Sequence, residues 1–270
     1  MEEAPEPGEP VARVVGWSAP ERLNSVSLSP AIDTDPAISA DGLELFFIST
    51  RAGNYRIFMS ARTSASSPWA TPVAVSSLWG NATVNDHDPD LSDDGLTIFF
   101  TRRTIVGTTL VTRLYTATRP IRSIAFGPPV LVHGLEDVTA EAPNISPDGQ
   151  TLYFTKPDAA NFELYKAALQ TNPDGSTSWA VVGPVRRWNS TLFEDSLSVT
   201  RDEAYFESNR GGAWRLYVSV RSPDIGWSIP DVVEDVPGGQ LRADVTADAR
   251  DMVFTMSPNG GEPDIYEVRR

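Results

Sequence analysis

Acidic side chains recur in this sequence directly before predicted strands, where they can act together. The set comprises Asp33, Asp35, Asp86, Asp88, Glu141, Glu194 and Asp195, with His87 between two of them. Carboxylate oxygens bind hard cations such as calcium, and paired carboxylates serve as acid and base in glycoside hydrolysis. Carboxylates can also cap strand ends and bond to neighbouring loops. Three interpretations stay open at this point. The acids can have a structural role, form a site for a cation or a basic partner, or take part in catalysis.

Two tryptophans form a second candidate feature. Trp79 and Trp188 lie outside the tryptophan positions that repeat along the chain, in predicted loops close to the acids. An exposed indole can stack on a sugar ring or on an apolar peptide side chain, whereas a buried one fills the space between elements. The sequence leaves both roles open.

Composition excludes several classes of function. The chain has 22 Lys and Arg against 36 Asp and Glu, a formal net charge of −14, which disfavours nucleic-acid binding. The sequence contains no cysteine, which removes disulfides and thiolate chemistry, and with two histidines it holds no histidine metal cluster. It also lacks the nucleophile elbow, the phosphate loop, the dinucleotide fingerprint and the zinc-protease motif. No apolar run approaches the roughly 20 residues of a membrane span. The composition therefore favours a binding protein over an enzyme.

Internal repeats indicate which elements position these residues. Similar motifs begin at Ser39 (SADG), Ser92 (SDDG), Ser146 (SPDG), Thr200 (TRDE) and Thr246 (TADA), at intervals of 53, 54, 54 and 46 residues. Such a period is typical of four-stranded propeller blades. Each motif leads to an aromatic residue that we expect to be buried: Phe47, Phe100, Phe154, Phe206 and Phe254.

The outermost strand of each unit has its own pattern, an aromatic residue followed by a proline. The pattern occurs at Trp69…Pro72, Phe126…Pro129, Trp179…Pro184 and Trp227…Pro230. Proline is tolerated at sheet edges, which places these segments outermost. The fifth copy, Trp17…Pro20, precedes the first unit. The sequence therefore predicts an all-β fold, a five-bladed β-propeller of four-stranded antiparallel blades, closed by the N-terminal strand completing the last blade.

The predicted domain boundaries follow from this closure. Residues 1–12 form an acidic, proline-rich segment that we expect to be a flexible arm, and residues 13–270 form a single propeller domain. Unit 2 carries about four extra residues within Thr104–Thr112, which we expect to lie on the channel face with the acids and to be able to cap the channel. We expect that face to be strongly negative, so that a calcium ion or a basic partner would neutralise it.

One unit carries a family resemblance. The run Asp33…Pro36…Ser39-Ala-Asp41-Gly42…Phe47…Arg51-Ala-Gly53 resembles the WD40-like (PD40, TolB-type) β-propeller repeat of bacterial envelope proteins, and similar units cover almost all of residues 13–270. The resemblance implies a non-enzymatic binding or scaffold propeller that is periplasmic, tethered to the outer membrane as a lipoprotein, or secreted. The N-terminal segment fits the remnant of a removed signal, although a cytosolic N-terminus would look similar.

Two functions follow from these observations. The first is binding of a protein or peptide partner at the channel face by a monomer that needs no cofactor other than calcium. The alternative is a glycan-binding module or glycosidase that uses the channel-face acids together with Trp79 and Trp188.

Overall fold

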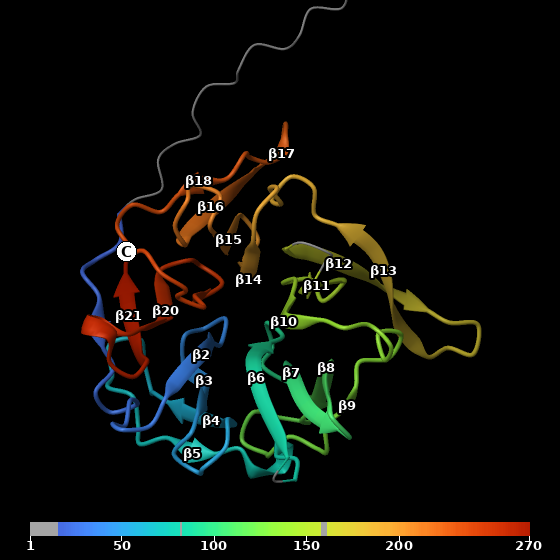
Figure 1. Ribbon diagram of the computed structural model, residues 1–270, viewed down its shortest axis with the longest axis horizontal. Helices are drawn as coiled ribbons and strands as arrows, with labels where there is room; N and C mark the ends of the chain where they lie inside the picture. Colours follow the sequence, from blue (N-terminus) through green and yellow to red (C-terminus); the bar gives the residue numbers. More distant parts are fainter. Residues whose placement is uncertain (1–15, 82, 158–160) are drawn as a thin grey trace, which may run out of the picture.

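The computed structural model describes residues 16–81, 83–157 and 161–270, and the strands of these residues form five antiparallel sheets around a central axis (Figure 1). This arrangement confirms the predicted five-bladed propeller. Two short 3₁₀ turns, η1 (Ser76–Leu78) and η2 (Pro258–Gly260), are the helical elements of the described residues. The predicted arm, residues 1–12, lies outside them.

The blades follow one another along the chain. Blade 1 comprises β2 (Asp33–Ile38), β3 (Glu44–Ser49), β4 (Arg56–Ala61) and β5 (Val73–Ala74). Blade 2 comprises β6 (Val84–Leu91), β7 (Thr97–Val106), β8 (Thr109–Thr118) and β9 (Val130–Leu131). Blade 3 comprises β10 (Glu141–Ile145), β11 (Thr151–Pro157), β12 (Phe162–Thr171) and β13 (Thr177–Pro184). Blade 4 comprises β14 (Glu194–Val199), β15 (Glu203–Ser208) and β16 (Arg215–Ser222), with β17 (Gly226–Trp227) and β18 (Asp231–Val232) both on β16.

Blade 5 contains both ends of the described chain. It comprises β19 (Asp244–Val245), β20 (Asp251–Met256), β21 (Asp264–Arg269) and, outermost, β1 (Glu21–Arg22). Arg22 lies opposite Tyr266 in the antiparallel register, and its guanidinium pairs with the Asp264 carboxylate at 2.7 Å. The N-terminal strand therefore closes the ring as predicted, covering a sheet edge that would otherwise be open.

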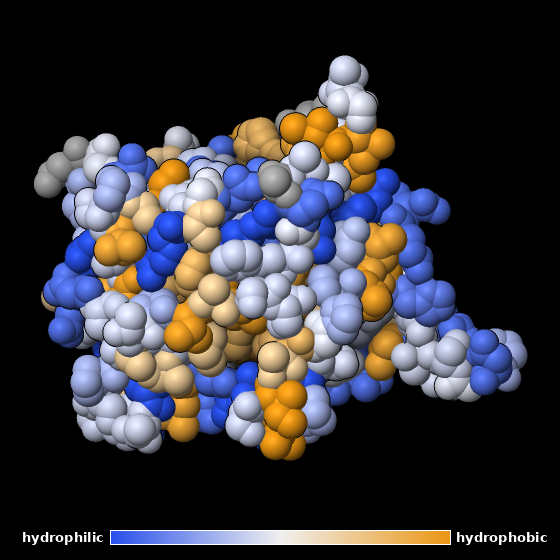
Figure 2. Space-filling view, turned by 90° about the horizontal axis from the view of Figure 1, so that it is seen from below, coloured by the Kyte–Doolittle hydropathy of each residue, from blue (hydrophilic) through white to orange (hydrophobic). Residues whose placement is uncertain are grey.

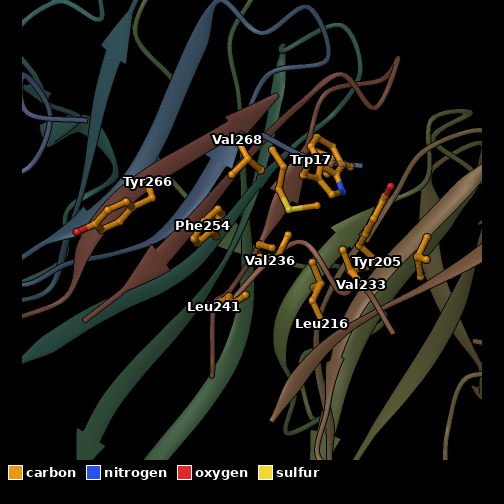
Figure 3. Packing of buried hydrophobic residues seen from close by; sticks show 13 residues of the cluster. Trp17, Tyr205, Leu216, Val233, Val236, Leu241, Phe254, Tyr266 and Val268 are labelled. Carbon is orange, nitrogen blue, oxygen red and sulfur yellow. The ribbon is translucent and has the colours of Figure 1, made fainter. Parts of the chain in front are cut away.

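The hydrophobic core is divided into clusters, each between two adjacent blades. Figure 3 shows the cluster between blades 4 and 5, where Trp17 and Tyr205 meet side chains of β20 and β21. The five repeated phenylalanines are all fully buried, at 0% exposure. Because the blades pack face to face, these aromatics fill the space between sheets, as the repeat predicts.

The innermost strands have an irregularity at corresponding positions. The pairing register of β2, β6, β10 and β14 with its neighbour shifts at this point. The residues with positive φ there, and at the matching place in blade 5, are Asp35, Asp88, Ala142, Ser196 and Arg242, with φ between 47° and 51°. A bulge of this kind redirects a side chain. We call these five residues the axial ring, because all of them line a cavity on the propeller axis.

Candidate functional site

Three of the predicted site acids are structural. Asp33, Asp86 and Glu194 are fully buried, and each accepts a hydrogen bond from an arginine of its own blade, over 2.8, 2.7 and 3.2 Å respectively. The arginines, Arg51, Arg102 and Arg210, also donate to the carbonyls of Val26, Leu78 and Trp188 in the loops that lead into the blades. This result corrects the prediction of ligand contact, because each carboxylate is used to hold a loop.

The axial ring brings together two other predicted acids and a residue that was not predicted. The Arg242 guanidinium lies 3.2 Å from Asp35 Oδ1 and 2.9 Å from Asp88 Oδ1, and it is 3.9 Å from Asp195 Oδ2. These four residues come from four different blades. The guanidinium therefore supplies an internal positive charge among acids for which the sequence predicted a calcium ion or a basic partner.

The buried acids Asp35, Asp88 and Glu207 differ in the direction and size of their pKa shifts. Burial acts to raise the pKa of Asp35, but Arg242 and His87 together hold it below its ordinary value. Burial and the neighbouring Asp35 carboxylate raise the pKa of Asp88 to about 6. Glu207, fully buried on β15, has its pKa raised by burial to about 8. At neutral pH Asp35 is therefore ionised and Glu207 largely protonated.

In three blades the backbone amide at the axial bulge donates a hydrogen bond to the preceding blade. Asp35 N donates to Thr255 Oγ1 over 3.2 Å, and Ala142 N donates to Thr101 Oγ1 over 3.0 Å. In blade 5 the amide of Arg242 donates instead to Glu207 Oε1. Each acceptor belongs to the second strand of the preceding blade, so these bonds join blade 5 to blade 1, blade 2 to blade 3 and blade 4 to blade 5.

The remaining predicted residues lie at the mouth of the channel and are partly exposed. His87 Nδ1 is 3.4 Å from Asp35 Oδ2, and the His87 ring packs on Tyr55 with 4.9 Å between centroids. Glu141 pairs with Arg103, and Asp195 accepts from Thr155 Oγ1 over 2.9 Å. The side chains of His87, Glu141 and Asp195 are 13%, 20% and 18% exposed, so a ligand on this face can contact them.

Both predicted tryptophans pack against aromatic side chains of the blades. Trp188 is fully buried between blades 3 and 4, where its ring lies 5.2 Å from that of Trp227 and 5.6 Å from that of Tyr153. Trp79 is half-buried against Phe58, and its indole N–H donates to the Ile57 carbonyl. Trp188 therefore fills space between the blades and is out of reach of a ligand, whereas Trp79 remains partly exposed.

The axial cavity is small. It measures about 40 Å³ and is lined by the axial ring together with Asp90 and Asp244. A water molecule needs roughly 10–15 Å³ of such volume, whereas pockets for organic ligands measure about 300–1,000 Å³. A sugar ring or a peptide side chain therefore does not fit on the axis. Among the described residues, no group of three or more His, Asp or Glu side chains is arranged to hold a metal ion.

The insertion in unit 2 extends one hairpin beyond the inner strand. The pairing of β6 with β7 ends at Val84 and Thr104, while β7 and β8 continue through Ile105 and Leu110. Ile105, Val106 and Leu110 are 61%, 62% and 61% exposed, and we call them the hairpin tip. The tip lies on the face where the inner strands begin, its side chains are exposed to solvent, and none of the three lines the axial cavity. Hydrophobic groups stand out at the upper and lower edges of the molecule in Figure 2.

Three residues of the site were missed by sequence reasoning, namely Arg103, Glu207 and Arg242. A signal for Arg242 existed, because it follows Asp35, Asp88, Ala142 and Ser196 at the repeat spacing. Aligning the units residue by residue through the axial ring places this arginine among the acids.

Comparisons with known proteins identify the fold. No family model matches this chain, and no curated protein matches it significantly. The TolB structure from Acinetobacter baumannii is 14% identical to this chain, with a TM-score of 0.49. The match covers 89% of this chain and 54% of the TolB chain, so this chain spans about half the length of TolB. A family 117 glycoside hydrolase from the marine bacterium Zobellia galactanivorans is 10% identical with a TM-score of 0.59, covering 94% and 90%.

A further similar structure is a GH62 hydrolase in complex with xylotriose, which is 10% identical with a TM-score of 0.61, covering 94% of this chain and 97% of that one. In residues 16–81, 83–157 and 161–270 no helix is long and apolar enough to cross a membrane. At such low identities, what the similar structures show of this chain is its β-propeller fold.

Proposed function

We propose that this protein is a non-catalytic binding propeller of the bacterial envelope or secreted fraction, and that a protein or peptide partner binds its channel face. The observation that supports this proposal is the position of Arg242. Its guanidinium joins Asp35 and Asp88 across the axis, above a cavity with room for only a few water molecules. A partner must therefore bind on the face and not inside the channel.

The channel face offers two kinds of contact to such a partner. The hairpin tip supplies three exposed aliphatic side chains. The mouth supplies the charge of Glu141, which is paired with Arg103, and that of Asp195, which lies 3.9 Å from the Arg242 guanidinium. An apolar anchor next to polar groups that fix orientation is the usual anatomy of a protein interface.

Cross-linking from this face tests the proposal. A photoreactive residue at position 106 should capture a discrete partner from extracts of the source organism, while the same residue at position 174, in the turn between β12 and β13 on the opposite face, should not. The double variant Val106→Ser, Leu110→Ser should abolish capture. The matched control is Ile121→Ser, Ile124→Ser, which removes two residues of similar exposure, 53% and 50%, from the opposite face. Equal capture by both double variants would refute the proposal.

Glycan binding or glycoside hydrolysis is the second candidate, supported by the separated pKa values of Asp35 and Asp88. Against it, Arg242 lies between these two carboxylates, and both predicted stacking tryptophans are packed against their blades. A glycan array and a panel of chromogenic glycosides distinguish the two functions. Hydrolysis that is lost in Asp35→Asn would overturn the non-catalytic assignment.

A further inference from the structure

Two carboxylates on the propeller axis have no cationic partner in the part of the chain that the structure describes. Asp90 on β6 and Asp244 on β19 lie two residues beyond the axial ring, and both line the axial cavity. The guanidinium that lines the same cavity, that of Arg242, is shared by Asp35, Asp88 and Asp195. The charged neighbour that acts most strongly on Asp90 is Asp244 itself.

The polar partners of these two carboxylates are neutral. Asp90 accepts from Asn144 Nδ2 over 2.9 Å and from Ile145 N over 2.7 Å. Asp244 accepts from Ser198 Oγ over 2.6 Å and from Ile38 N over 2.7 Å. Neutral donors orient the oxygens without balancing a negative charge. Burial and the neighbouring Asp244 carboxylate raise the pKa of Asp90 well above its ordinary value, and burial raises the pKa of Asp244 to about 6, so a proton or a cation must relieve the repulsion between the two acids.

A separate observation indicates a ligand in the cavity. Ser196 lines the same cavity and is only 9% exposed, yet its Oγ has no hydrogen-bond partner among the described residues. Three further lining residues, Pro36, Pro89 and Pro143, have no amide N–H to donate. Apart from the Arg242 guanidinium, which is shared by Asp35, Asp88 and Asp195, the wall is therefore rich in oxygen lone pairs and poor in free donors, which favours a cation over an anion.

We propose that the axial cavity binds one monovalent cation of sodium or potassium size, held by the carboxylates of Asp90 and Asp244 with the hydroxyl of Ser196. A volume of about 40 Å³ accommodates such an ion with one or two water molecules. A calcium ion takes six to eight oxygen ligands, commonly several carboxylates. Four aspartates line this cavity, but among the described residues no group of three or more His, Asp or Glu side chains is arranged to hold a metal ion. The proposal goes beyond partner binding because it concerns the inside of the ring and not its face.

Thermal unfolding at constant chloride concentration tests the proposal. The wild-type melting temperature should be about 2 °C or more higher in sodium or potassium chloride than in tetramethylammonium chloride, whose cation is too large for the cavity. Asp244→Asn should lose this difference, and Asp137→Asn, at an exposed site on the loop after β9, should keep it. Equal melting temperatures of the wild type in all three salts would overturn the proposal. So would an increase seen with calcium and with neither monovalent ion.

A crystal soaked in thallium(I), which substitutes for potassium, provides a test that needs no variant. The expected result is one anomalous peak on the axis within coordination distance of Asp90 and Asp244. A peak confined to the acids of the mouth, or no peak, would overturn the assignment.

Discussion

Asp86 and Asp88 lie two residues apart on β6, are both buried, and have different roles. Asp86 accepts from Arg102 of its own blade and lies 3.7 Å from Arg56 of the preceding blade. Asp88 faces the axis and shares Arg242 with acids of two other blades. In a regular strand, side chains two apart point to the same face, so the bulge between them is what separates their functions.

The difference extends around the ring. At the position of Asp86, an acid with an arginine partner recurs in blades 1 and 4, which is what a shared structural requirement produces. At the position of Asp88 the five residues are Asp, Asp, Ala, Ser and Arg, so nothing in the shared blade structure fixes their type. Recurrence across blades therefore indicates a structural role, and divergence at one geometric position indicates a role specific to this protein.

The first prediction concerns the structural position. Asp86→Ala should destabilise the fold by about 3–5 kcal/mol, because it leaves two buried guanidinium groups without their shared carboxylate. Urea unfolding measures the loss, with Asp137→Ala at an exposed position as the control. Asp86→Asn, which keeps one hydrogen-bond acceptor, should lose less and remain folded if the alanine variant does not. A loss no larger than that of the control would contradict the structural assignment.

The sequence was sufficient to predict the fold because the repeat carries redundant signals. The five buried phenylalanines, the outer-strand prolines and the displaced copy at Trp17 all indicated the same closed ring. Each signal rests on burial or on backbone restriction, and these depend on local residue type.

The candidate site was predicted only in part, for identifiable physical reasons. The positive φ at Asp35 and Asp88 occurs without glycine, so nothing in the sequence marks the bulge that turns them to the axis while Asp33 and Asp86 face their own blades. The exposure of a loop tryptophan depends on the neighbouring blade, and Trp188 proved to be fully buried. Arg242 was obscured by the shorter interval before the last motif.

The second prediction uses Glu207, which holds the amide of Arg242. Its pKa rises from 4.5 to about 8 on folding, so between these values the folded state binds more protons and the wild type loses stability as pH increases. Glu207→Gln removes this loss. The free energy of unfolding of the variant relative to the wild type should therefore increase by about 1.4 kcal/mol per pH unit, or roughly 3 kcal/mol between pH 5 and 7. A difference that does not change with pH would show that Glu207 is ionised in the folded protein.

The third prediction tests the interaction energy between Arg242 and Asp88 across the axis. The substitutions use residue types that the axial ring already contains. Arg242→Ser introduces the side chain found at Ser196, and Asp88→Ala introduces that of Ala142. Arg242→Ser should destabilise the wild type by roughly 1–2 kcal/mol more than it destabilises the Asp88→Ala variant, because in the latter one fewer carboxylate is left unpaired. A double-mutant cycle from urea unfolding gives this energy. Simple additivity would mean that the short contact between Arg242 and Asp88 contributes nothing.

The smallest effect is expected at the mouth of the channel. Glu141 lies at the start of the inner strand of blade 3, and its ion pair with Arg103 is partly exposed, at 20% and 29% for the two side chains. Exposed pairs contribute about 0–1 kcal/mol and are screened by salt, so Glu141→Gln should cost less than about 1 kcal/mol at low salt and almost nothing at 0.5 M sodium chloride. Urea unfolding at the two salt concentrations measures both values. A loss comparable to that of Asp86→Ala would place Glu141 with the loop-holding acids and would remove it from the surface proposed to contact a partner.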